Sequence, residues 1–147
     1  MSTDLPRLIG INHVALEVGD VDEALAFYGK IFSFTLRGRG KGQAFIDLGD
    51  QFLALMQTET PHRDGARHFG LVVDDRARVR VLVEAAGAKM VDGPFVDFLD
   101  PWGNRIEIVA YADIQFSKAP SVLRGMQFPG DKSAEAKKQL AKKNMAP

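Results

Sequence analysis

Apolar and polar residues alternate in the stretch LIGINHVALEV at residues 8–18. Alternation with a period of two is typical of a β-strand that buries one face. The apolar face would consist of Val14, Leu16 and Val18, and the opposite face of His13, Ala15 and Glu17. The first predicted strand therefore carries a histidine on the side away from the core.

The same pattern returns twice in the second half of the chain. Residues 66–73 place Phe69, Leu71 and Val73 on one face and His68 on the other. Residues 105–110 place Ile106 and Ile108 on one face, and Arg105, Glu107 and Val109 on the other. The turn sequence DPWGN at 100–104 precedes this last strand, with Pro to preset φ and Gly to accept a positive φ.

Each histidine-bearing strand is followed by a predicted amphipathic helix. Asp20 and Asp75 can cap the two helix N-termini, and apolar residues at helical spacing follow each cap. Gly87 suits the C-terminal end of the second helix. Short strands are predicted at residues 34–37, 43–48, 51–57 and 88–91, and two more within 95–110.

The two halves can be aligned on each other. His13, Val18 and Asp20 correspond to His68, Val73 and Asp75 at an offset of 55 residues. A tandem repeat of this kind indicates that neither half buries its apolar face alone. We therefore predict an α+β domain of two tandem β-α-β-β-β modules that form a curved, barrel-like mixed sheet, with the helices on its convex side.

Residues 1–111 would hold these paired modules, at 8–57 and 66–111, with a connector at 58–65. Residues 112–147 form a basic C-terminal extension with seven Lys or Arg against three Asp or Glu, a net charge of +4. We expect it to be partly helical, with a surface helix within 131–144. The alternatives are a flexible tail, or a docked segment that covers the concave surface or reaches a partner chain.

The composition excludes several classes of function. The whole chain has 19 basic and 19 acidic residues, so no nucleic-acid partner is predicted. It has no cysteine, which excludes a disulfide framework and a thiolate site. Residues 1–10 lack the pattern of a signal peptide, and no stretch is long and apolar enough to span a membrane. We expect a cytoplasmic protein with no membrane partner.

Three polar residues carry the candidate chemistry. His13 and His68 occupy equivalent positions in the two modules, and by strand parity both face the concave side with Glu107. Two histidines and a carboxylate can bind Fe(II), Mn(II), Co(II), Ni(II) or Zn(II) and leave positions open for substrate. The alternative is that the three residues line a pocket without a metal.

Four motifs lie within residues 8–111, namely INHV at 11–14, DEALAFY at 22–28, HFG at 68–70 and DPWGNRIE at 100–107. They resemble the vicinal oxygen chelate superfamily, which includes glyoxalase I, fosfomycin-resistance proteins, methylmalonyl-CoA epimerase, extradiol dioxygenases and bleomycin-resistance proteins. The resemblance implies paired modules and a divalent metal held by His13, His68 and Glu107. It also implies a homodimer, in which His13 of one chain could meet His68 and Glu107 of the other.

The sequence departs from several subfamilies of this group. Glyoxalase I has a fourth metal ligand, a glutamate that is also its base, and the corresponding position in this chain is about Ala54. The nearby polar residue, Gln57, faces the opposite side of the strand. The hydroxyl of fosfomycin-resistance enzymes corresponds to Ala15. An extradiol dioxygenase would need an acid–base histidine, for which His62 is the candidate, and a tyrosine before Glu107, which is absent. Bleomycin-binding members generally lack the metal ligands.

Other residues are candidates for substrate contacts. Arg105 shares the face of Glu107 and could bind an anionic group, or it could be solvated. Glu17 shares the face of His13 and is a candidate base for a large substrate. An apolar pocket could be lined by Phe45, Phe52, Met56, Trp102 and Tyr111, for which core packing is the alternative role.

From the sequence we predict a divalent-metal-dependent, glyoxalase-like enzyme that acts on a small oxygen-chelating substrate, with isomerase- or lyase-type chemistry. The alternatives are an Fe(II)-dependent dioxygenase and a non-catalytic small-molecule-binding protein of the bleomycin-resistance kind.

Overall fold

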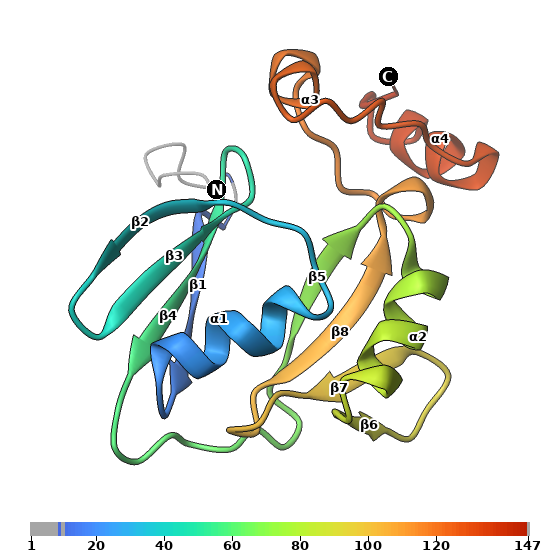
Figure 1. Ribbon diagram of the computed structural model, residues 1–147. Helices are drawn as coiled ribbons and strands as arrows, with labels where there is room; N and C mark the ends of the chain where they lie inside the picture. The colour runs from blue at the N-terminus through green and yellow to red at the C-terminus, as the bar shows by residue number, and fades with distance from the viewer. Residues whose placement is uncertain (1–8, 10, 147) are drawn as a thin grey trace, which may run out of the picture.

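The computed structural model describes residue 9 and residues 11–146 (Figure 1). The first strand begins at His13, and the expectation about a signal peptide concerns residues 1–10, of which only residue 9 is described. The prediction of two tandem β-α-β-β-β modules is confirmed. The elements of the first module are β1 (His13–Val18), α1 (Val21–Gly29), β2 (Leu36–Gly40), β3 (Gln43–Asp47) and β4 (Phe52–Gln57). Those of the second are β5 (Phe69–Val73), α2 (Arg76–Ala85), β6 (Lys89–Val91), β7 (Val96–Leu99) and β8 (Arg105–Ala110).

Local sequence signals account for the ends of both helices. Asp20 accepts a hydrogen bond from the backbone N–H of Glu23 at 2.8 Å, and Asp75 accepts one from Arg78 at 2.9 Å. Gly87 follows α2 with φ +72, the left-handed conformation that favours glycine. The predicted limits of β2 are wrong, because that strand runs on to Gly40 and shifts register between Leu36 and Gly38.

Each module forms its own four-stranded mixed sheet. The strand order is β1-β4-β3-β2 in the first and β5-β8-β7-β6 in the second. In the first sheet, β1 begins at His13 and runs parallel to β4. In the second sheet, β5 begins directly after His68 and runs parallel to β8. The other strand pairs are antiparallel. The two sheets are curved but remain separate, and they do not close into one barrel.

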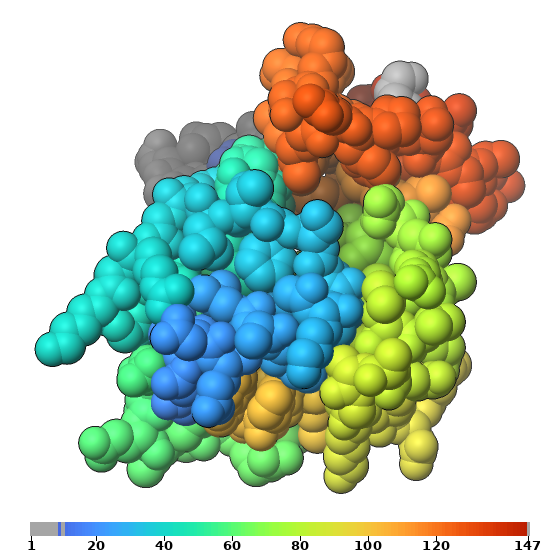
Figure 2. Space-filling view, viewed as in Figure 1, coloured from blue at the N-terminus to red at the C-terminus, as the bar shows by residue number. Residues whose placement is uncertain are grey.

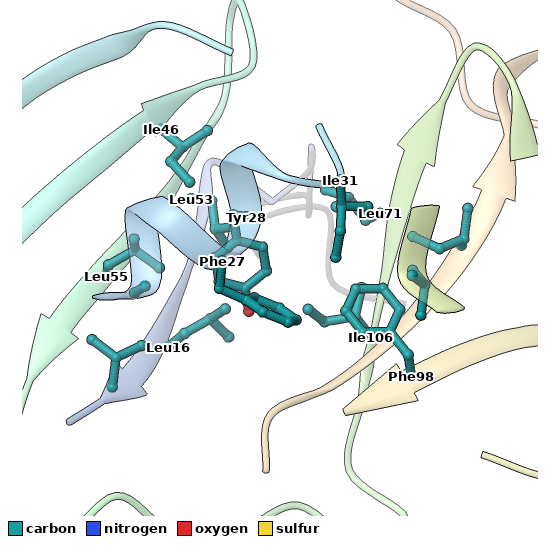
Figure 3. Close-up of a cluster of buried hydrophobic side chains, with 14 of the residues drawn as sticks. Leu16, Phe27, Tyr28, Ile31, Ile46, Leu53, Leu55, Leu71, Phe98 and Ile106 are labelled. Atoms are coloured by element: carbon teal, nitrogen blue, oxygen red, sulfur yellow. The ribbon is translucent and has the colours of Figure 1, made fainter. Parts of the chain in front are cut away.

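Helix α1 lies between the two sheets and fills a core that they share (Figures 1 and 3). Phe27 on α1 approaches Phe98 of the second module, with ring centroids 6.3 Å apart. The buried Tyr28 hydroxyl donates to Asp100 Oδ2 at 2.7 Å. Burying a large apolar side chain stabilises the fold by about 1.5–3 kcal/mol, so each module depends on the other for much of its stability.

The C-terminal extension packs on itself and contacts the first module. It contains a 3₁₀ turn (Tyr111–Asp113), α3 (Pro120–Gly125) and α4 (Ala134–Ala141). The ammonium of Lys132 lies 3.6 Å from the centroid of the Tyr111 ring and donates to the backbone carbonyls of Tyr111, Ile114 and Phe116. Lys118 forms an ion pair with Asp50 of the first module. Figure 2 shows the extension, in orange and red, covering one end of the molecule.

Among the residues that the structure describes, none belongs to a helix long and apolar enough to cross a membrane.

Candidate metal site

His13 lies on the face of its sheet opposite the shared core. It is paired with Phe52 across β1 and β4, and the two rings are stacked with centroids 4.6 Å apart and an interplanar angle of 9°. Its Nδ1 lies 3.0 Å from Asn12 Oδ1, which places the ring proton on Nδ1. The unprotonated Nε2 is therefore the nitrogen that can bind a metal ion.

His68 and Glu107 lie together in the second module. His68 Nε2 is 3.2 Å from Glu107 Oε2, and His68 Nδ1 donates to the carbonyl of Ala66 at 2.9 Å. A second hydrogen bond of this kind fixes the ring of a metal-binding histidine and sets which nitrogen is free. Both candidate histidines thus have Nδ1 engaged, and Nε2 of His68 lies against Glu107.

One chain brings together two of the three predicted ligands. Across residue 9 and residues 11–146, no three His, Cys, Asp or Glu side chains lie close enough to hold a metal ion together. His13 belongs to the first module, and the core around α1 lies between that module and the second. A three-ligand site would therefore need His13 from a second copy of the chain.

The strand registers are equivalent in the two modules. Ala15 pairs with Ala54 in the first module, and Gly70 pairs with Glu107 in the second. Ala54 is therefore the counterpart of Glu107, as the repeat in the sequence indicates. The side chain of Gln57 caps α1 by accepting from the backbone N–H of Val21 at 3.1 Å, so it is engaged away from this position.

The carboxylate of Glu17 is held by the connector. Its Oε2 accepts from the backbone N–H of His62 at 2.8 Å and lies 3.0 Å from His62 Nδ1. These hydrogen bonds, and then the nearby charge of His62, lower the pKa of Glu17 below its ordinary value. A carboxylate with a lowered pKa is a poorer proton acceptor near neutral pH, which weakens the case for Glu17 as a base.

We expect His62→Ala to raise the pKa of Glu17 toward its ordinary value, because the ring contact and its charge are lost while the backbone donor remains. A carboxylate with a depressed folded-state pKa stabilises the fold above its unfolded pKa, and that contribution fades as pH falls through the folded value. The variant should therefore lose less stability on acidification than the wild type. Carbon-detected NMR titration of the Glu17 carboxyl would measure the shift, and an unchanged pKa would contradict this assignment.

Arg105 is engaged by an acidic neighbour. Its Nε and Nη2 lie 2.9 and 2.8 Å from Asp97 Oδ2, and its Nη1 donates to the carbonyl of Gly65 at 3.1 Å. Asp97 itself pairs with Glu107 across β7 and β8, so the two carboxylates share one face. The sequence holds one signal for Asp97, which is the match of FID at 45–47 with FVD at 95–97.

The predicted pocket residues fall into two groups. Phe45 and Phe52 are half-buried on the face of His13, with ring centroids 5.7 Å apart, and Met56 lies on the same face with 39% of its surface exposed. Trp102 packs against the backbone at Gly19, and Tyr111 is buried between Phe116 and Phe128 of the extension. Trp102 and Tyr111 therefore serve packing in this chain.

The sequence model of the glyoxalase/bleomycin resistance protein/dioxygenase superfamily matches residues 10–108. The chain belongs to this superfamily. It is 26% identical over 113 residues to the glutathione transferase FosA of Serratia marcescens. That alignment covers 69% of this chain and 80% of FosA. It is 25% identical over 111 residues to the metallothiol transferase FosB of Lysinibacillus sphaericus (strain C3-41). That alignment covers 66% of this chain and 79% of FosB.

Solved structures of the superfamily share the fold. A mutant of the fosfomycin resistance protein FosX from Listeria monocytogenes, complexed with Mn(II) and 1S,2S-dihydroxypropylphosphonic acid, aligns with a TM-score of 0.60 at 17% identity. The alignment covers 69% of this chain and 90% of the FosX chain.

Proposed function

We propose that this protein is a divalent-metal-dependent, glyoxalase-like enzyme that works as a homodimer on a small oxygen-chelating substrate. Each site would take His13 from one chain and His68 with Glu107 from the other. The observation that carries the proposal is the distance of 3.2 Å between His68 Nε2 and Glu107 Oε2. Two candidate metal ligands therefore already lie together in the second module, and the first module supplies the third, His13.

The residues fit a divalent metal of the first transition series. Imidazole nitrogen and carboxylate oxygen are suitable ligands for Fe(II), Mn(II), Co(II), Ni(II) or Zn(II). The engaged Nδ1 atoms of His13 and His68 leave both Nε2 atoms as ligands. When bound, such a metal would act as a Lewis acid toward adjacent substrate oxygens and would stabilise negative charge on them.

The other residues on these faces would position and shield the substrate. The stacked ring of Phe52 holds the imidazole of His13, and Phe45 packs against Phe52 edge-on. Together they form an apolar wall beside one ligand, which would exclude water from that side of the substrate. Isomerase- or lyase-type chemistry at this site would need a proton acceptor from the substrate or solvent, since Ala54 stands where glyoxalase I has its glutamate.

Transfer of a thiol to the substrate is a second candidate function. FosA and FosB, the two curated relatives described above, are both thiol transferases by name. Attack by a thiolate would form a C–S bond while a C–O bond of the substrate breaks, and the freed oxygen would take up the proton that the thiol has lost. No protein base has to remove a proton from carbon, so Ala54 is compatible with this chemistry. The apolar wall of Phe45 and Phe52 would suit either reaction.

Elemental analysis of the purified protein, with thermal unfolding scans in Mn(II), Co(II), Fe(II), Ni(II) and Zn(II), tests the proposal. We expect about one ion per chain, and a raised melting temperature, because an ion at about 100 times its Kd stabilises the folded state by roughly 2.7 kcal/mol. Sedimentation should give a dimer. Oxygen uptake after anaerobic loading with Fe(II) would favour a dioxygenase. A dimer that neither contains nor responds to any of these metals would leave a metal-free binding protein.

A further inference from the structure

The ring of Phe52 has a charged group on the face that His13 does not cover. His13 is stacked on one face of this ring, with centroids 4.6 Å apart and an interplanar angle of 9°. The guanidinium carbon of Arg37 lies over the same ring, 4.8 Å from its centroid. Strand β1, with His13, and strand β2, with Arg37, are on opposite sides of β4 in the order β1-β4-β3-β2. The two groups therefore cover opposite faces of Phe52, and the stack runs from imidazole to phenyl ring to guanidinium.

An irregularity in β2 aims Arg37 at this ring. The register between β2 and β3 shifts between Leu36 and Gly38, so Arg37 is the extra residue of a bulge. An extra residue bends the strand and re-aims its own side chain, and bulges are over-represented next to active sites. In this chain the bend leaves Arg37 on the sheet face that carries Asp47 and Phe52, which are paired across β3 and β4.

The guanidinium of Arg37 is itself held by the chain. Its Nη2 lies 3.2 Å from Asp47 Oδ1, and it donates to the backbone carbonyls of Gly49 at 2.8 Å and Gln51 at 2.9 Å. These acceptors lie in residues 47–51, which end β3 and lead directly into Phe52 at the start of β4. A planar guanidinium held at several points is a fixed surface for an aromatic ring to stack on. The ring of Phe52 therefore has little freedom to tilt away from His13.

We propose that Arg37 is a positioning residue for His13, an inference that rests on the metal site proposed above. Arg37 acts only through Phe52, because the phenyl ring stands between the guanidinium and the imidazole. Two contacts then orient His13: Asn12 engages its Nδ1, and the ring that Arg37 supports sets the plane of the imidazole. Together they aim Nε2 at the ion. Replacing a group that orients a metal ligand from behind typically costs about 10–100-fold in metal affinity.

NMR of the metal-free protein tests the stack itself. The chain has three histidines, so replacing them one at a time assigns each pair of imidazole proton signals. Protons above the face of an aromatic ring are shifted upfield, and we expect this shift for His13 in the wild type. In Arg37→Ala the His13 signals should move toward the positions typical of an unstacked histidine. The signals of His62 and His68, which do not contact Phe52, should stay in place.

Calorimetric titration with Mn(II) gives the second readout. We expect the Kd to rise about tenfold in Arg37→Ala and by less in Arg37→Lys, whose ammonium can still bind the ring face but lacks the planar fork. Arg39→Ala is the matched control, because it removes another arginine of β2, one whose partner is Asp22 on α1, and it should change neither readout. Thermal scans and sedimentation would establish that each metal-free variant folds and dimerises. Arg37→Met, which keeps the aliphatic chain, replaces Arg37→Ala if the alanine variant does not fold.

The outcomes separate this inference from the function on which it rests. If the wild type fails to bind Mn(II), the metal site itself is wrong and the inference fails with it. If Mn(II) binds and Arg37→Ala leaves either the His13 signals or the Kd unchanged, the metal site stands and the positioning role is overturned. Shifted signals for all three histidines, or a dissociated dimer, would assign Arg37 to general support of the fold or the interface, which also overturns it. Shifted His13 signals with a weaker Kd, in Arg37→Ala but not in Arg39→Ala, support it.

Discussion

Mixing two inactive variants should restore metal binding that neither has alone. His13→Ala and Glu107→Ala each damage every site of their own homodimer, and we expect each to lower metal affinity by more than about 100-fold, since even changes behind the ligands cost 10–100-fold. In a mixed dimer, one site combines the intact His13 of one chain with the intact His68 and Glu107 of the other. Random pairing makes about half the dimers mixed, which gives roughly a quarter of the wild-type sites.

The measurement is a Mn(II) titration of the two variants after unfolding and refolding them together. The control mixes His68→Ala with Glu107→Ala, whose changes fall on the same module, so that no chain combination yields an intact site. Recovery in the first mixture and none in the second would establish a site shared between chains. If neither mixture recovers binding while the wild type binds Mn(II), the three ligands must meet within one chain.

The fold could be predicted from the sequence because its signals are local and repeated. The alternation around His13 and His68, the caps Asp20 and Asp75, and the offset of 55 residues between them each depend on neighbouring residues alone. The structure confirms both caps and both modules. The limits of β2 were not predictable in this way. Three glycines favoured a turn at residues 38–42, but pairing with β3 extends the strand through Gly38 and Gly40, so only Gly42 lies in the turn.

The candidate site could be predicted only in part. Parity places Glu107 and Arg105 on the correct face, but the partner of Arg105 depends on the register between β7 and β8, which brings Asp97 opposite Glu107. Parity also cannot say how the two modules face each other. The packing of α1 between the sheets sets that arrangement, through contacts such as Phe27 with Phe98, and it leaves His13 apart from the other two candidate ligands.

Asp100→Ala should be among the most destabilising single changes in this chain. The carboxylate is 3% exposed and accepts four hydrogen bonds, from the Tyr28 hydroxyl, the backbone N–H groups of Trp102 and Asn104, and the Asn104 side chain. Asn104 Nδ2 also donates to the carbonyl of Glu17. Asp100 and its partner Asn104 therefore join the β7–β8 turn to α1 through Tyr28 and to β1 through Glu17. Its removal leaves several buried donors unpaired.

We expect a loss of about 3–5 kcal/mol in the free energy of unfolding, the range found when a buried charged partner is removed. For a chain of this length that lowers the melting temperature by roughly 10 °C. Urea unfolding followed by circular dichroism, at one fixed protein concentration, measures the loss. Tyr28→Phe is the control, because it removes one donor and keeps the ring, and it should cost only about 1 kcal/mol. Equal losses in the two variants would mean that the turn needs only the tyrosine contact, and that the other three hydrogen bonds contribute little to joining the modules.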